Sequence, residues 1–334
     1  MTEHVAGLDV SLETTTICVI DGQGRIVLES SVATDPDLIA AVLAPHALRL
    51  VRLEAGPMSE WLHTGLAQHG LETVVMETRQ VRAALKASQV KTDRRDACGI
   101  AHLLRMGWFR PVHVKTVSGR ERRVLLGARD TLVRRTRDLD NSVRGLLRSF
   151  GLRPPRLLRG RWSDAVRQLI AAHPMLATAI EPILVARDKL ARLDRLVRDQ
   201  ARDDAVCRRL TTVPGVGAIV ALSYVVAIDD PTRFARSRAV GPVLGLTPSR
   251  YQSGATDRPG TITKAGDARA RVALFEAAHV MMIRVAGWFP LKAWAMRVAA
   301  RRGAKRAKVA LARRLAVILH RMWVDGTDFQ AQPA

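Results

Sequence analysis

The first ninety residues alternate between short apolar runs and polar breaks. Runs rich in Val, Ile and Thr are typical of strands, and runs with apolar residues three or four apart predict helices. The predicted strands are His4–Val10, Thr15–Ile20, Arg25–Ser30, Leu48–Leu53 and Glu72–Met76. The predicted helices are Asp37–Leu43, Ser59–His69 and Val81–Ala87.

The order of these elements is βββαβαβα. The turn residues Asp21-Gly22-Gln23-Gly24 separate the second strand from the third, as expected for neighbouring antiparallel strands. This order predicts an α/β domain with an RNase H-like fold, and we assign it to residues 1–118.

A long amphipathic helix is predicted from Arg120 to about Phe150. Its apolar positions recur every seven residues at Leu125, Leu132, Leu139 and Leu146, with Val133, Val143 and Leu147 beside them. Its other face is dense in arginine. Pro154 and Pro155 end the helix because proline lacks a backbone donor.

A shorter periodic segment covers residues 183–197 and has coiled-coil-like spacing over two heptads. Such a segment fits a helical hairpin or a dimer contact. We assign residues 119–204 to an arginine-rich helical region.

From Ala205 to the C-terminus the pattern is mostly helical, so we expect a mostly α third domain over residues 205–334. A stretch rich in glycine and proline, residues 241–266, interrupts it and is expected to be an irregular loop.

Charge divides the chain unevenly. The formal net charge is +22 over 334 residues. Residues 1–118 hold 12 Lys/Arg and 13 Asp/Glu, whereas residues 119–334 hold 41 and 18. A charge of this size indicates a polyanionic partner such as nucleic acid, gripped by the basic part of the chain.

The three cysteines, Cys18, Cys98 and Cys207, are too few and too scattered to predict a disulfide framework or a CxxC zinc site. They fit a reducing cytoplasm. No apolar run is long enough for a membrane span, and acidic Glu3 and Asp9 do not fit a signal peptide. We therefore expect a cytoplasmic, nucleoid-associated protein.

Four acidic residues stand where this fold order could bring them together. Asp9 lies in the first strand and Glu54 closes the fourth, while Asp93 and Asp96 are three apart and would share one face of a helix. Carboxylate oxygens suit Mg²⁺, which serves phosphodiester chemistry. Taken singly, each acid is better explained without a metal: an acid at a strand end is usually a cap or turn residue, and Asp93 and Asp96 beside Arg94 and Arg95 fit a solvated helix start. The set of four in this fold order is much more specific.

Thr212-Val213-Pro214-Gly215-Val216-Gly217-Ala218 lies between two apolar helical segments. A glycine-rich hairpin at a helix N-terminus exposes backbone N–H groups, so Gly215 and Gly217 could contact a DNA phosphate, as in a helix-hairpin-helix. A plain tight turn between packed helices is the alternative.

Ser253 precedes Gly254 within the glycine-rich stretch, near several basic side chains. A serine there could act as a nucleophile, with cations that stabilise phosphate charge. Residue types alone also allow an ordinary loop serine, since no base stands beside it. The candidate nucleic-acid contacts are Arg94, Arg95, Gly215, Gly217, Arg250, Lys264, Arg269 and Arg271.

These motifs together resemble the transposases of the insertion sequence 110 group, related to the Piv-type DNA invertases. The resemblance rests on Gly-Leu-Asp-Val at 7–10, Lys-Thr-Asp-Arg-Arg-Asp-Ala at 91–97, Val-Pro-Gly-Val-Gly at 213–217, Gly-Leu-Thr-Pro at 245–248 and Ser253-Gly254. Ala55-Gly56-Pro57 departs from the Thr-Gly and aromatic residue of many relatives.

The resemblance implies a RuvC-like DEDD domain in which Asp9, Glu54, Asp93 and Asp96 bind Mg²⁺ or Mn²⁺ as catalytic residues. It implies Ser253 as the nucleophile of a covalent phosphoserine intermediate. It also implies three partners: DNA at the element ends and target, a structured guide RNA, and further copies of the chain in a dimer or tetramer.

Two rival functions remain open. One is a RuvC-type junction nuclease that uses water, with Ser253 only structural. The other is a basic architectural protein that binds DNA or RNA, with the carboxylates as remnants of the fold.

Overall fold

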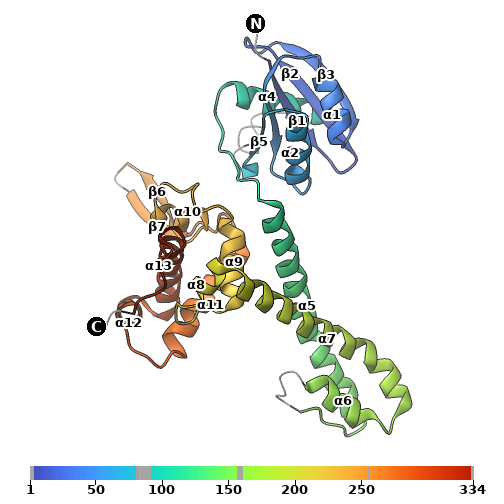
Figure 1. Cartoon of the computed structure of the whole chain (residues 1–334), viewed down its shortest axis with the longest axis vertical. Helices are drawn as coiled ribbons and strands as arrows, with labels where there is room; N and C mark the ends of the chain where they lie inside the picture. The colour runs from blue at the N-terminus through green and yellow to red at the C-terminus, as the bar shows by residue number, and fades with distance from the viewer. Residues whose placement is uncertain (1–3, 80, 82–91, 156–160, 255, 332–334) are drawn as a thin grey trace. The chain divides into compact units, whose positions relative to one another are not determined.

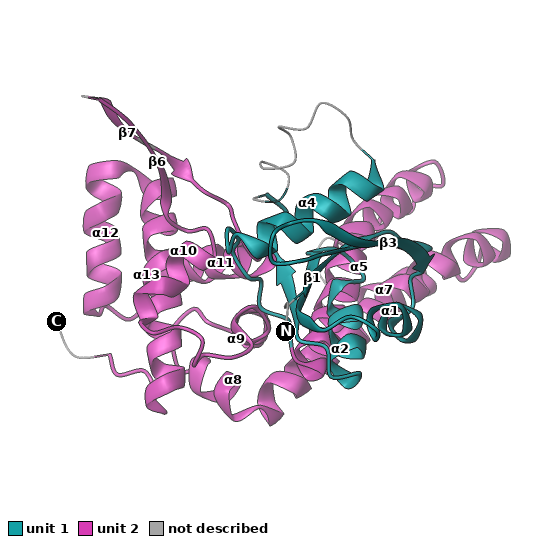
Figure 2. Cartoon of the chain, turned by 90° about the horizontal axis from the view of Figure 1, so that it is seen from above, with its two compact units in different colours: residues 1–115 teal, residues 116–334 magenta. Residues whose placement is uncertain are grey.

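The computed structural model describes residues 4–79, 81, 92–155, 161–254 and 256–331. The chain forms two compact units, Met1–Lys115 and Thr116–Ala334, coloured separately in Figure 2. The predicted division into 1–118, 119–204 and 205–334 stays an interpretation of the sequence.

Unit 1 contains a five-stranded sheet (Figure 1). Its strands are β1 (His4–Val10), β2 (Thr14–Ile20), β3 (Ile26–Ala33), β4 (Leu48–Glu54) and β5 (Thr73–Met76), in the order β3-β2-β1-β4-β5. The first three strands are antiparallel, and β4 runs parallel to both β1 and β5. This topology confirms the predicted RNase H-like fold. The predicted helix at 81–87 lies, except for Val81, outside the described residues.

Helices pack on both faces of this sheet. The alternation of side chains places Ala6 and Leu8 in a core with α1 (Pro36–Leu43) and α2 (Ser59–Gln68). Val5, on the opposite face, packs with residues of α4 (Asp93–Arg105). The sheet is therefore the middle layer of unit 1. Among the described helices, α4 is the one that packs against β1 and β2 on the face opposite α1 and α2.

The predicted long helix is α5 (Val117–Arg148), which packs against α7 (Pro174–Asp203). The short helix α6 (Trp162–Ile170) packs against the N-terminal part of α7. Its buried stripe contains Val143 and Leu147, as predicted, but departs from the heptad of leucines: Leu126 is buried, whereas Leu146 is 57% exposed. A 3.6-residue helix drifts against a strict seven-residue repeat, so the stripe facing a partner shifts along 32 residues.

The remaining helices form the largest apolar core. They are α8 (Ala205–Leu210), α9 (Ala218–Ile228), α10 (Val240–Val243), α11 (Ala268–Ile283), α12 (Pro290–Arg302) and α13 (Ala304–Asp325), with a 3₁₀ turn at Ser237–Ala239. Leu126 of α5 and Val197 of α7 share this core. Residues on both sides of position 204 are thus buried together.

The expectation of an irregular loop at 241–266 was wrong in part. The segment contains a β-hairpin of β6 (Pro248–Ser253) and β7 (Thr256–Ile262). Most of its described side chains are exposed, so β6 and β7 lack the apolar alternation by which sequence patterns reveal strands.

The sequence predicted no disulfide framework, and the described residues, which include all three cysteines, form none. They do contain one bonded pair that was not predicted: Cys18 and Cys98 are joined, and Cys207 is a buried free thiol. Eighty residues separate the pair, so spacing along the chain could not reveal it. No helix within the described residues is both long and apolar enough to cross a membrane.

Candidate active site

Asp9 and Glu54 lie at adjacent positions in the sheet. In the register of the parallel strands β1 and β4, Leu8 is the partner of Leu53, so the next residue on each strand is one of the two acids. Glu54 is the last residue of β4. Both side chains are half-buried. The carboxyl ends of parallel strands thus bring both acids to one edge.

Asp93 and Asp96 lie in the first turn of α4, which begins after Thr92. The Thr92 hydroxyl caps the helix by accepting a hydrogen bond from the Arg95 backbone N–H at 3.3 Å. Acidic residues are favourable in this first turn because the helix dipole is positive there. The three-residue spacing places the two carboxylates on one face.

The direction of α4 relates these acids to Asp9. Ala97 and Ala101 contact Gly7, while Leu104 packs with Val5 farther back along β1. The helix therefore runs opposite to β1, and its first turn lies toward the strand end that carries Asp9. All four acids lie toward the same end of the sheet.

Oxygen donors of this kind suit Mg²⁺ or Mn²⁺. Asp9, Glu54 and Asp96 are half-buried and Asp93 is exposed, so each member of the set is at least partly open to solvent. Within the described residues, the group of three ligating side chains with atoms inside 4.8 Å is Cys18, Glu29 and Cys98 instead. The four carboxylates would have to draw closer around a cation.

Ser253 lies at the end of β6, paired with Thr256 across the hairpin, and its side chain is exposed. Arg250 crosses the same hairpin to Asp257, with Nε–Oδ1 and Nη2–Oδ2 distances of 2.9 and 2.6 Å. Asp257 raises the pKa of Arg250, and Arg250 lowers the pKa of Asp257. This bidentate pair fastens the two strands close to Ser253.

Two predicted nucleic-acid contacts are engaged within unit 2. The Arg269 Nε donates to Asp130 Oδ2 of α5 at 2.7 Å. Arg271 donates to three backbone carbonyl groups, those of Leu244, Ala265 and Gly266. Both guanidinium groups therefore hold the C-terminal core together, whatever else they contact.

The other predicted contacts are more open. Arg94 and Arg95 are exposed in the first turn of α4, and Lys264 is exposed with a φ of 54°. Gly217 precedes α9, and a side chain there would meet nothing within 4 Å. Gly215 differs: its φ is +88°, and a Cβ would press on the Ala277 carbonyl of α11. Gly215 is thus required by packing.

Three contributors were not predicted from the sequence. Gly7 lets α4 approach the sheet, Asp257 pairs with Arg250, and Asp130 pairs with Arg269. A glycine inside a strand signals close approach of another backbone, so Gly7 could have been found. The two aspartates carry no local signal.

Two family models match the chain. A DEDD transposase model of the IS110 type matches residues 6–151, which include all four acids. A model described as the transposase IS116/IS110/IS902 family matches residues 207–292, which include the hairpin. The chain belongs to the IS110 family of transposases. It is therefore a DNA-binding enzyme that cleaves and recombines DNA.

Curated relatives of this IS110-family transposase match along most of their length. The transposase for insertion sequence element IS1111A of Coxiella burnetii is 27% identical over 94% of this chain and 88% of its own. A probable family 20 transposase of Pseudomonas aeruginosa is 28% identical over 81% of this chain and 82% of its own.

Among solved structures, Thermus thermophilus RuvC is similar, with 16% identity and a TM-score of 0.26. It matches 33% of this chain and 99% of its own. A structure of the same protein with a Holliday junction substrate has a TM-score of 0.27. The RNase H-like assignment rests on the strand order and register above, not on these two likenesses.

Proposed function

We propose that this IS110-family transposase uses Asp9, Glu54, Asp93 and Asp96 to hold Mg²⁺ or Mn²⁺ and Ser253 to attack DNA. The observation that carries the proposal is the placement of four acids toward one end of an RNase H-like sheet. The exposed position of Ser253 at a hairpin end supports its part.

The proposed chemistry has two parts, one for the serine and one for the metal. The Ser253 oxygen forms a bond to phosphorus and loses its proton. The bond from phosphorus to the leaving sugar oxygen breaks, and that oxygen takes up a proton. A hydroxyl group of a second DNA end then reverses the step and frees the serine. Bound divalent metal would stabilise the charge that develops on the phosphate.

The basic unit 2 supplies the grip on nucleic acid in this proposal. Residues 116–334 hold 41 Lys/Arg against 18 Asp/Glu, and residues 284–321 contain no acidic side chain. Phosphate neutralisation by such a surface supplies sequence-independent affinity. We further propose that a structured RNA of the element guides target choice, since charge of this kind accommodates RNA as well as DNA.

The enzyme would act as a dimer or tetramer in the bacterial cytoplasm, at the nucleoid. The α5–α7 pair is the surface we assign to assembly, because it leaves apolar side chains such as Leu146, Val185 and Leu196 exposed. Light scattering with and without DNA, on the wild type and a Leu146→Glu variant, tests this assignment.

The decisive experiment looks for DNA joined covalently to protein. Purified protein is incubated with element-end DNA, the candidate guide RNA and Mg²⁺, and the products are run on a denaturing gel. We expect a slow DNA–protein band in the wild type that disappears in Ser253→Ala.

Ser249→Ala is the matched control. Ser249 lies on the same strand as Ser253 but away from the tip of the hairpin, and its hydroxyl donates to the Thr261 carbonyl. It should keep the band. Asp9→Asn should abolish cleavage, whereas Glu72→Gln, which removes an exposed acid of unit 1, should not. Cleavage without a band, unchanged in Ser253→Ala, would replace the serine mechanism with a water-using nuclease.

A further inference from the structure

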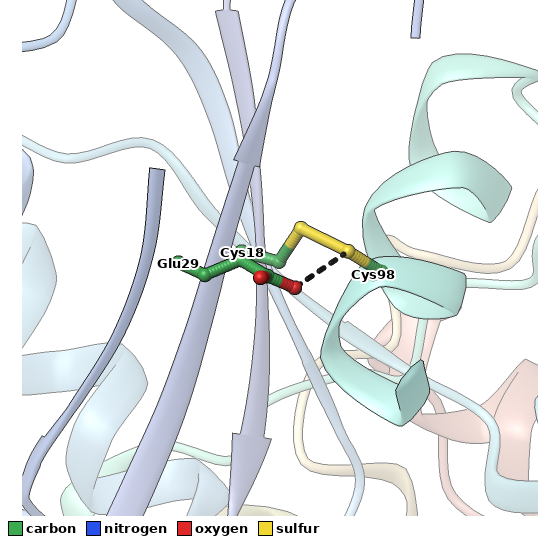
Figure 3. Close-up of side chains that lie close together, drawn as sticks. All are labelled: Cys18, Glu29 and Cys98. Carbon is green, nitrogen blue, oxygen red and sulfur yellow. Dashed lines mark hydrogen bonds between the residues drawn. A yellow bond between two sulfur atoms is a disulfide. The ribbon is translucent and has the colours of Figure 1, made fainter. Parts of the chain in front are cut away.

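A disulfide joins the sheet of unit 1 to the helix that carries two of the four acids. Cys18 belongs to β2 and Cys98 to α4, and their Cα atoms are 5.2 Å apart (Figure 3). That separation lies within the usual range for a disulfide. The packing of β2 and α4 thus accommodates the bond.

The packing of α4 explains why the sulfurs meet. Cys18 is the register partner of Gly7 in the antiparallel pair β1–β2. Gly7 has no Cβ, so the Ala97 carbonyl and the Ala101 N–H of α4 approach its backbone directly. Cys98 follows Ala97 and therefore comes to rest beside Cys18. Two rigid elements hold the two thiols in place.

We propose that Cys18 and Cys98 form an oxidisable dithiol, a redox modification site whose co-substrate is a small peroxide. The Cys98 sulfur attacks a peroxide oxygen, the O–O bond breaks, and water leaves with the thiol hydrogen. The Cys18 sulfur then attacks the hydroxylated sulfur, the S–O bond breaks, and a second water leaves with the Cys18 hydrogen. Two molecules of a small cellular thiol then exchange with the bond in turn, restore both cysteines as thiols and leave joined as a disulfide.

Exposure sets the order of these steps. Cys18 is fully buried, whereas Cys98 is half-buried. The Cys98 Sγ lies 3.7 Å from Glu29 Oε1, and Glu29 is an exposed residue of β3 (Figure 3). A small oxidant therefore reaches Cys98 from the Glu29 side. Cys207 stays outside the reaction, because burial raises the pKa of its thiol to about 12.

The bond would act on the site of the proposed function. Cys98 stands two residues after Asp96, in the second turn of α4. The carboxylates have to draw closer to hold a cation, and a bond from α4 to β2 restrains that movement of the first turn. The oxidised enzyme therefore cleaves DNA more slowly than the reduced enzyme. This consequence, unlike the dithiol itself, rests on the proposed function.

The dithiol is tested without DNA. Full-length protein is reduced, exposed to a slight excess of hydrogen peroxide, unfolded, alkylated and weighed. We expect three alkylated cysteines before oxidation and one after it, with a peptide linking Cys18 to Cys98. In Cys98→Ser the number of alkylated cysteines should stay the same after peroxide treatment. Cys207→Ser should still form the linked peptide. Sulfinic acid at Cys98 without a linked peptide would overturn the proposal.

Thermal unfolding gives a second measurement. Closing an 80-residue loop in the unfolded chain should raise the melting temperature of unit 1 on the order of 10 °C, reversed by a reductant. Amide hydrogen exchange in the first turn of α4 should slow in parallel. An unchanged melting temperature in fully bonded protein would contradict a tether between α4 and β2.

The rate at which the enzyme cleaves element-end DNA in the presence of Mg²⁺ tests whether the bond inhibits the proposed function. We expect at least a tenfold lower rate in the oxidised wild type, recovery with a reductant, and no peroxide sensitivity in Cys98→Ser. Equal rates in bonded and reduced protein would overturn the inhibitory role. Absence of cleavage in both states would count against the proposed function, while mass and melting data would still decide the dithiol.

A cation at the same three side chains is the competing outcome. Reduced protein is therefore titrated with Zn²⁺ alone. Stoichiometric binding that is lost in both Cys98→Ser and Glu29→Gln, with no linked peptide after peroxide, would replace the dithiol with a thiolate metal site.

Discussion

Gly7 of β1 and Ala97 of α4 touch backbone to backbone, and a Cβ on Gly7 would overlap the Ala97 carbonyl oxygen. This contact fixes how close α4 lies to the sheet. It thereby sets the position of Asp93 and Asp96, in the first turn of α4, relative to Asp9 on β1.

Gly7→Ala should destabilise unit 1 by about 1–3 kcal/mol, because overpacking forces the backbone of α4 away from the sheet. Gly22→Ala is the matched control, since a Cβ there would meet nothing within 4 Å. Denaturant unfolding of both variants measures the difference. If the two variants lose the same stability, the close contact is not what holds α4.

Arg271→Ala should loosen the segment around the β6–β7 hairpin. Its guanidinium donates to the carbonyl groups of Leu244, Ala265 and Gly266, and removing it leaves these acceptors without that donor, at a cost of about 1.5–3 kcal/mol. Limited proteolysis should then cut the segment sooner. Arg258→Ala, at an exposed position of β7, should leave proteolysis unchanged.

Asp204 should stabilise unit 2 in a pH-dependent way. Burial by itself raises the pKa of Asp204, but hydrogen bonds from the Cys207 N–H and Arg122 outweigh burial and lower it. A carboxyl with a lowered folded-state pKa stabilises the fold fully above the unfolded value of about 3.9. That stability is lost as the pH falls through the folded-state pKa.

The variant Asp204→Asn separates this charge effect from helix capping, because asparagine also caps α8. At neutral pH it should cost about 1 kcal/mol, and once the pH falls below the lowered folded-state pKa of Asp204 it should unfold together with the wild type. Asp203→Asn removes an adjacent exposed charge and should show no such convergence. A constant difference from pH 7 to pH 2 would contradict the Asp204 pairing.

Asp257→Asn should tighten non-specific DNA binding. Two hydrogen bonds join the Arg250 guanidinium to the Asp257 carboxylate across the hairpin. Removing the carboxylate charge therefore frees the Arg250 guanidinium to bind a phosphate. One added phosphate contact steepens the slope of log affinity against log salt by about 0.9. Binding isotherms at several salt concentrations measure this slope, with Asp203→Asn as the control. A slope that matches the control would mean that Arg250 does not reach DNA.

Local patterns predicted much of unit 1. The strands that carry Asp9 and Glu54 showed as apolar runs, and the three-residue spacing of Asp93 and Asp96 indicated one helix face, although α4 itself was not among the predicted helices. Periodicity within a strand or helix is a property of neighbouring residues, so one sequence displays it. The RNase H-like order followed from these elements.

The β6–β7 hairpin that carries Ser253 was not predicted, because it lacks such a local pattern. Its strands are exposed and polar, and a cross-strand pair such as Arg250–Asp257 gives no alternation to detect. The heptad leucines of α5 matched its buried stripe only in part, since the helices packed against it, α7 and α9, decide which positions are covered.

The sequence by itself determined the order of the five strands with α1 and α2 in unit 1, the four acids and the excess of positive charge, because these depend on residue identity and short-range pattern. Only the tertiary structure decided that Cys98 bonds to Cys18, that Asp130 pairs with Arg269, and that Gly7 determines how closely α4 packs on the sheet. Contacts across 80 or more residues arise from packing in three dimensions, which leaves no trace in the spacing of residues along the chain.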